Sequence, residues 1–201
     1  MSEDGPAFLG DHGGGADPEG QGRQPGRDPA SQAREICLRL LTLSPRTRAQ
    51  LAGALRKRGI DDDVAEEVLS RFEDVGLIDD AAFARAWVES RHYSRGLAGR
   101  ALSAELKQRG VGAEEIRAAI DEQLGPDDEV SGARRLVDKK LKATRGLPQE
   151  QRTRRLAGML ARKGYPPGLA FRVIREALEA DGEQAFPEDE PYFDPPVLDA
   201  E

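Results

Sequence analysis

The sequence predicts an all-α protein: a tandem array of three three-helix repeats, about nine helices in an elongated and curved body. Two observations lead to this fold class. The pattern Leu-x3-Leu-x3-Gly, followed by an apolar residue, occurs three times at nearly equal spacing, in residues 51–60, 102–111 and 156–165. Elsewhere Gly and Pro divide the chain into stretches of helix length, and no alternating apolar run is long enough for a sheet.

The repeated pattern describes one helix and its end. Leu51 and Leu55 are four residues apart, so they form one apolar ridge on a helix. Arg58 places a cation at the negative end of the helix dipole, and Gly59 supplies the left-handed residue that closes the helix. The equivalent residues of the other two copies are Leu102, Leu106, Arg109 and Gly110, and Leu156, Leu160, Lys163 and Gly164.

The remaining helices are placed by their breaks and caps. Ser44 is expected to be an N-cap with Pro45 at the first helical position, where its missing N–H costs nothing. Each repeated helix is followed by a second amphipathic segment, as in Val64, Val68 and Leu69. The expected helices are 31–42, 46–58, 61–74, 79–92, 96–109, 113–124, 127–144, 149–163 and 166–180.

One three-helix unit of this length buries too little surface to be stable alone, so adjacent units are expected to stack into an elongated body. The domain division follows from the repeat and from composition. We expect a Gly/Pro-rich arm at 1–30, three-helix repeats at 31–78, 79–126 and 127–180, and an acidic tail at 181–201.

The formal net charge of −7 is unevenly distributed. The arm and the tail hold too few apolar groups to offset the entropy of ordering, and both are expected to be disordered. The tail carries eight acids and no Lys or Arg, together with Phe186, Tyr192 and Phe193. It is interpreted as a solubilising segment, with docking on a partner or folding back on the third repeat as alternatives. Residues 131–180, in contrast, hold thirteen Lys and Arg against four acids.

The sequence offers little for catalysis, and neither enzyme activity nor a cofactor is expected. The only histidines are His12 and His92, which excludes a histidine-based metal site. The acids at 61–63 and 66–67 fall in the first turns of a helix, where the dipole stabilises carboxylates. Cys37, the single cysteine, is expected to be a small buried residue. No segment approaches a membrane span or a signal peptide, and a cytoplasmic protein is expected.

The third repeat carries the clearest candidate for binding. Its cations lie on two consecutive expected helices, and Arg135, Lys139 and Lys142 share one face by their spacing. Such a ridge neutralises phosphates in a salt-dependent, sequence-independent manner, and an acidic protein surface fits it equally well. A plain solvated face is the alternative. The candidate residues are Arg134, Arg135, Lys139, Lys140, Lys142, Arg152, Arg154, Arg155, Arg162 and Lys163.

Residues 76–93 gather the only tryptophan, a histidine and several charges, and packing explains them better than chemistry. Gly76 closes one helix, and Asp79 or Asp80 caps the next. Phe83 and Trp87 lie on one helical face, where they are expected to anchor the first unit against the second. Of the flanking residues, Arg91 is expected to lie over the Trp87 indole and His92 to rest on the surface.

The stretch "GLIDDAAFARAWVESR", followed by "RGLAGRALSAELKQRGV", closely resembles the RecX family of bacterial regulatory proteins, which modulate the RecA recombinase. The resemblance covers roughly residues 33–180. Its positions are Gly76, Leu77, Ile78, Asp79, Asp80, Phe83, Ala84, Trp87, Val88, Arg91, Arg95, Gly96, Leu102, Leu106 and Gly110.

The resemblance implies nine helices in three repeats and a non-catalytic protein. Such a protein binds the groove of RecA–single-stranded-DNA filaments and suppresses ATP hydrolysis, strand exchange and co-protease activity. It thereby modulates recombination, DNA repair and the SOS response. In this interpretation Arg91, Arg95 and Arg100 line the central surface, and the protein is a monomer with RecA, and single- or double-stranded DNA, as partners.

The alternative is a stand-alone helical nucleic-acid-binding or transcriptional regulatory protein. Against it, no expected helix presents the Asn, Gln and Arg set that reads base edges in a helix-turn-helix protein.

Overall fold

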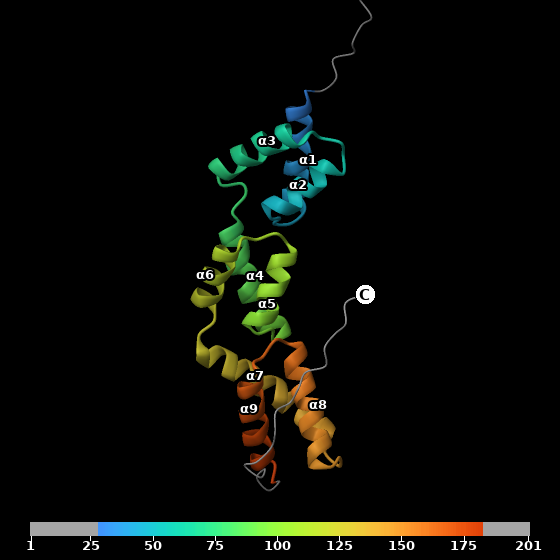
Figure 1. The fold of residues 1–201 in the computed structure, drawn as a ribbon, viewed down its shortest axis with the longest axis vertical. Helices are drawn as coiled ribbons and strands as arrows, with labels where there is room; N and C mark the ends of the chain where they lie inside the picture. The colour runs from blue at the N-terminus through green and yellow to red at the C-terminus, as the bar shows by residue number, and fades with distance from the viewer. Residues whose placement is uncertain (1–27, 183–201) are drawn as a thin grey trace, which may run out of the picture.

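The computed structural model describes residues 28–182, and within them it confirms the predicted all-α class. The arm, the tail beyond Gly182 and His12 lie outside the described residues. The body is elongated, with three helical units following one another along the long axis (Figure 1). The helices are α1 (Pro29–Leu43), α2 (Arg48–Arg56), α3 (Asp62–Asp74), α4 (Asp80–Arg95), α5 (Gly99–Gln108), α6 (Ala113–Gln123), α7 (Pro126–Leu141), the 3-10 helix η1 (Lys142–Thr144), α8 (Gln149–Arg162) and α9 (Pro167–Ala180).

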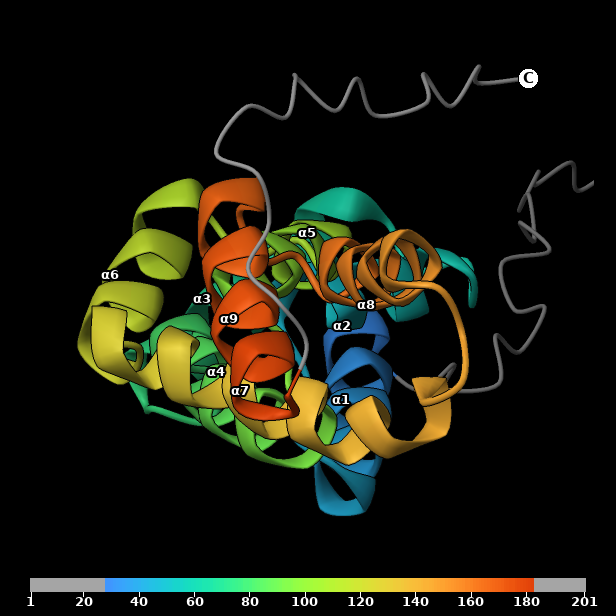
Figure 2. The ribbon, with the colours of Figure 1, turned by 90° about the horizontal axis from the view of Figure 1, so that it is seen from below.

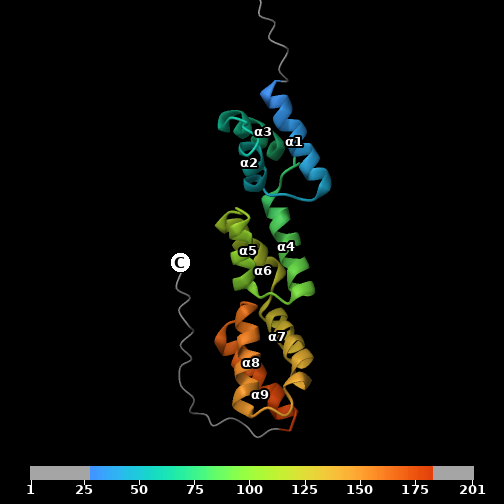
Figure 3. The ribbon, with the colours of Figure 1, turned by 90° about the vertical axis from the view of Figure 1, so that its right-hand side faces the viewer.

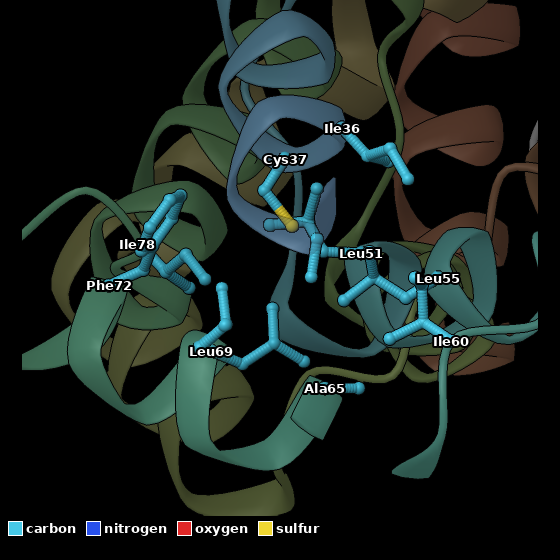
Figure 4. Packing of buried hydrophobic residues seen from close by; sticks show 11 residues of the cluster. Ile36, Cys37, Leu51, Leu55, Ile60, Ala65, Leu69, Phe72 and Ile78 are labelled. Carbon is cyan, nitrogen blue, oxygen red and sulfur yellow. The ribbon is translucent and has the colours of Figure 1, made fainter. Parts of the chain in front are cut away.

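Each unit has its own apolar core, made from the leucine ridge of its middle helix and the facing sides of the other two. In the first unit Leu51 and Leu55 are fully buried among residues of α1 and α3 (Figure 4). Cys37 is buried in the same cluster, as predicted, and burial raises the pKa of its thiol. Complete burial of a leucine side chain stabilises a fold by about 2 kcal/mol, so each ridge contributes substantially to its unit.

Glycines end the helices as the repeat predicts. Gly59, Gly110 and Gly164 have φ of 74°, 79° and 87°, in the left-handed region that only glycine adopts readily. The expected start of the second helix is wrong, because Ser44 instead follows the end of α1. Thr47 caps α2 through a capping box: its Oγ1 accepts from the Gln50 backbone N–H at 3.2 Å, and Gln50 Oε1 accepts from the Thr47 backbone N–H at 3.3 Å.

The first and second units meet where the N-terminus of α2 reaches the C-terminal end of α5. Thr47 Oγ1 donates to the backbone carbonyl of Arg109 at 2.6 Å. The Arg48 N–H, the first of α2, donates to the Asp80 carboxylate at 2.9 Å. A Cβ added to Gly110 would lie 2.2 Å from the Cβ of Ala49, so the closeness of this contact depends on glycine.

The second and third units meet in an equivalent way. The Ala98 backbone N–H, at the N-cap of α5, donates to the carbonyl of Lys163 at 2.9 Å. The Gly99 N–H donates to the Glu129 carboxylate at 2.8 Å. A Cβ on Gly164 would lie 2.5 Å from the Ala101 nitrogen. The middle helices α2, α5 and α8 therefore follow one another in a single column, as Figure 3 shows.

His92 is buried in this second junction, which corrects the expectation that it rests on the surface. Its side chain is 3% exposed, and its Nδ1 lies 3.0 Å from the Leu97 carbonyl. A Cβ on Gly132 would meet both the His92 ring and the hydroxyl of Tyr165. A histidine at the end of an amphipathic helix gives no local sign of burial, because Gly132, in the neighbouring unit that covers it, is distant along the chain.

Candidate partner-binding surface

The candidate cations do not share one environment. Most are exposed: Arg95, Arg100, Arg134, Arg135, Lys139, Lys140, Lys142, Arg154, Arg155 and Arg162. Arg91 and Lys163 are half-buried, and Arg152 is buried. Figure 2 looks along the long axis onto the third unit, in which α9 packs against both α7 and α8.

Seven of the exposed cations belong to α7, η1 and α8, and together they are called the basic surface of the third unit. They are Arg135, Lys139, Lys140 and Lys142 from α7 and η1, and Arg154, Arg155 and Arg162 from α8. Within residues 28–182 none of the seven forms an ion pair with a carboxylate. Arg134, in contrast, is bonded to Glu176 of α9, which neutralises it. These seven side chains are therefore available to an anionic partner.

Arg152 is a structural residue, which corrects its place among the surface candidates. It is 2% exposed, its Nε donates to Thr144 Oγ1 at 3.2 Å, and its Nη2 donates to the Asp181 carboxylate at 2.9 Å. Arg145 donates to both oxygens of the same carboxylate. Hydrogen bonds from Arg145 and Arg152 lower the pKa of Asp181 to about 2. The two arginines thus fasten the end of α9 to η1 and α8.

Two arginines lie over the Trp87 indole, Arg91 as predicted and Arg109 in addition. The Arg91 guanidinium lies 4.1 Å from the indole centroid, and Arg109 lies 3.7 Å from it. Phe83 stacks on the same indole with centroids 5.7 Å apart, and the indole N–H donates to Glu105 at 2.9 Å. Phe83 and Trp87 both pack onto the core of the second unit itself. The hydrogen bonds between the first and second units are made by Thr47 and Arg48 instead.

Arg100 lies on an open groove between α5 and α6, with a volume of about 320 Å³. Lys107 and Arg117, two cations absent from the predicted set, line the same groove. Lys107 follows Arg100 by seven residues, so the helical period places both on one face of α5. Arg117 is bonded to Glu114 at 3.1 Å, whereas Arg100 and Lys107 have no carboxylate partner among the described residues. The groove is a second, smaller cationic feature of the body.

The described residues offer no site for a metal ion. No group of three or more His, Cys, Asp and Glu side chains between residues 28 and 182 is arranged to hold one. Asp62 and Asp63 lie in the first turn of α3, as predicted, whereas Glu66 pairs with Arg48. None of the described helices is long and apolar enough to cross a membrane.

Comparison with known proteins identifies the fold and the family. Three family models match in order: RecX first three-helix domain at residues 33–72, RecX second three-helix domain at 79–120, and RecX third three-helix domain at 127–174. The crystal structure of RecX from Lactobacillus salivarius superimposes with a TM-score of 0.68 at 19% identity, over 74% of this chain and 96% of that one.

Curated relatives are similar over most of their length. The chain is 64% identical to the regulatory protein RecX of Streptomyces lividans over 160 residues, which is 80% of this chain and 85% of the relative. It is 61% identical to that of Thermobifida fusca over 161 residues, covering 80% and 86%. The identity to that of Mycolicibacterium smegmatis is 45% over 171 residues, covering 83% and 90%.

Fold and surface together define a helical repeat protein that presents cations from consecutive units of an elongated body. The matches make the family explicit: this chain belongs to the RecX family of regulatory proteins.

Proposed function

We propose that this protein acts in the cytoplasm as a monomer that binds the RecA–single-stranded-DNA filament and inhibits its ATPase, strand-exchange and co-protease activities. Membership of the RecX family supports this function, because the family's members are named as regulatory proteins. Recombination, DNA repair and the SOS response are the processes that such inhibition modulates.

The observation that carries the proposal is the equivalence of the two junctions. The same pair of contacts, from a middle-helix N-cap to the next C-cap carbonyl and from the first helical N–H to a carboxylate, joins each unit to the next. The units are thereby held in line, and a filament of identical protomers offers binding sites that also repeat. Several weak contacts held in line gain affinity from one another by multivalency.

Within this proposal the basic surface of the third unit and the exposed Arg95 and Arg100 of the second contact the filament. The acceptors are phosphates of the bound strand or carboxylates of the RecA protomers, and both are recognised by the same charge-assisted bonds. No chemical step on the part of this protein is required. Occupation of the filament groove is sufficient to oppose hydrolysis and strand exchange.

The test follows the DNA-dependent ATPase of RecA from the same organism, with this protein added below the concentration of RecA. Strong inhibition is expected from the natural chain, and weak inhibition from the double variant R154E/R155E. The matched control is R172E/R175E, which reverses two exposed cations of α9 in the same unit and lies outside the candidate set. Undiminished ATP hydrolysis at saturating natural protein would refute the proposal.

The seven cations without a carboxylate partner among residues 28–182 also favour a second function, binding of single-stranded nucleic acid without RecA. The affinity for an oligonucleotide is then expected to fall with rising salt, and R154E/R155E is expected to flatten that dependence by roughly 1.4 in logarithmic slope, about 0.7 per phosphate contact. Salt-dependent binding combined with an unchanged RecA ATPase would favour this function over filament inhibition.

A further inference from the structure

The most acidic segment of the chain follows directly after its most basic part. Residues 183–201 contain seven Asp and Glu and no Lys or Arg, and they include Phe186, Tyr192 and Phe193. This segment lies outside the described residues. Its point of departure, at Gly182, belongs to the described part of the third unit.

Asp181 fixes that point of departure against the third unit. It follows the last residue of α9, and its carboxylate accepts hydrogen bonds from Arg145, just after η1, and from Arg152 of α8. The first acid of the acidic run is therefore already bound between the two elements that carry the basic surface. The segment that follows therefore starts from a residue bonded to α8 and to the residue after η1, the elements that carry Arg154 and Lys142.

The segment is also long enough to extend across the whole basic surface. A chain of this length, fully extended, spans about 60 Å, whereas the fourteen residues of α8 span only about 21 Å. A tethered ligand of this length has an effective concentration of the order of millimolar, so even weak ion pairs are populated. The seven cations that have no carboxylate partner within residues 28–182 are matched in number by the seven carboxylates of the segment.

We infer that residues 183–201 bind across the basic surface of the third unit and compete there with an external anionic partner. The contact itself is independent of the proposed function, whereas its role as a competitor rests on that function. Acidic side chains of the segment take the positions that phosphates or partner carboxylates occupy, and a partner has to displace them. Raised salt weakens both interactions together, because both are ion pairs at an exposed surface.

The contact is tested on the full-length protein alone by zero-length carbodiimide cross-linking at low protein concentration, followed by peptide mass spectrometry. Amide bonds between residues 183–201 and Lys139, Lys140 or Lys142 are expected. The exposed Lys57 and Lys107, in the other two units, serve as internal controls and are expected to remain unlinked to the segment. Links distributed equally over all five lysines, or no links at all, would overturn the inference.

The competition is tested with a neutralised segment, E188Q/D189N/E190Q, compared with the natural chain in binding a fluorescently labelled oligothymidine. The variant is expected to bind about tenfold more tightly at low salt, and the difference is expected to vanish at high salt. Equal affinities at all salt concentrations would refute the competition.

If neither form binds the oligonucleotide, the competition for phosphate is wrong, and the cross-links still decide whether the contact exists. If the cross-links form and RecA hydrolysis is unaffected by the protein, the proposed function fails while the contact stands. The two proposals therefore fail on different measurements.

Discussion

The two junctions between units use the same plan with different chemistry. At the first, a side-chain hydroxyl, Thr47 Oγ1, donates to the Arg109 carbonyl, and Gly110 lies against the methyl group of Ala49. At the second, the donor is the backbone of Ala98, and Gly164 lies against the backbone of Ala101.

The second junction has further contacts that the first lacks. Lys163 Nζ donates to the carbonyl of Arg95 at 2.8 Å, and buried His92 and Tyr165 both pack on Gly132. Backbone donors survive every substitution except proline, whereas a hydroxyl is lost with a single change. The first junction therefore depends on one replaceable hydroxyl for its N-cap contact, whereas the second makes the equivalent contact with a backbone N–H and adds the packing on Gly132.

The largest expected effect comes from filling the second junction. In Gly164→Ala the new Cβ would lie 2.5 Å from the Ala101 nitrogen, on a backbone with φ of 87°. Strain and overpacking together are expected to cost about 3 kcal/mol or more, measured by urea unfolding.

Two glycines provide the graded controls for that substitution. Gly110→Ala, at the first junction, is expected to cost less because the obstacle is one methyl group on the less firmly held unit. Gly59→Ala has a similar positive φ, 74°, with open space around it, and should cost only about 1 kcal/mol. Equal losses for all three would show that close packing at the junctions is unimportant.

Next in size is the loss of the hydroxyl at the first junction. Thr47→Val removes both the bond to the Arg109 carbonyl and the N-cap of α2, and is expected to cost about 2 kcal/mol. Hydrogen exchange should locate the loosening in the first unit. Thr42→Ala, which removes an exposed hydroxyl bonded within α1, is the control and should change stability by less than about 0.5 kcal/mol. Loosening of the third unit instead would contradict the comparison.

Acid is expected to act on the units unequally. Folding lowers the pKa of Asp181 from 3.8 to about 2, so its stabilising contribution is complete above pH 3.8 and is lost as the pH falls toward 2. Folding raises the pKa of Asp80, mainly through burial, so protonation favours the folded state there as the pH falls.

As the pH falls, the end of α9 and η1 should therefore open at a higher pH than the contact between Arg48 and Asp80. Amide hydrogen exchange measured during an acid titration would show this order. Asp181→Asn is expected to remove the acid dependence in the third unit, at the expense of its stability at neutral pH. Asp80→Asn is the control and should leave that dependence unchanged. Simultaneous opening of both regions would contradict the assignment of the acid sensitivity to Asp181.

The smallest expected effect on stability comes from Arg109→Ala, at the first junction. The Arg109 carbonyl accepts from Thr47, while its guanidinium covers Trp87, so the only tryptophan reports on this region. Arg109→Ala keeps the carbonyl and is expected to cost about 0.5–1 kcal/mol, with a clear shift in tryptophan emission. Arg100→Ala, which removes an exposed cation outside the Trp87 contacts, should leave the emission unchanged. An unchanged spectrum in Arg109→Ala would exclude the stacking.

The fold was largely predictable because its signals are local. Leucines at a spacing of four and a closing glycine specify a helix and its end without reference to the rest of the chain. The burial of Arg152 was not predictable, because it sits in a run of cations and its partner Asp181 is twenty-nine residues away. Thr47 lies in a Thr-x-x-Gln capping box, a sequence signal that the prediction from Ser44 and Pro45 did not use.

The sequence predicted which unit is rich in cations, but not which of those cations are exposed and free of carboxylate partners within residues 28–182. The number of cations identified the third unit. In the structure, however, Arg152 is buried and Arg134 is neutralised by Glu176. Lys107 and Arg117 were missed because a groove between two helices has no sequence signature.

The column of middle helices also gives the molecule a direction. In each junction the C-terminal end of one middle helix meets the N-terminal end of the preceding unit's, so α8, α5 and α2 all point the same way. Their peptide dipoles add along one axis, and the negative pole falls at the end of α2, where Arg56, Lys57 and Arg58 lie. The two ends of the elongated body therefore differ in charge, so its two orientations along a directional partner are not equivalent.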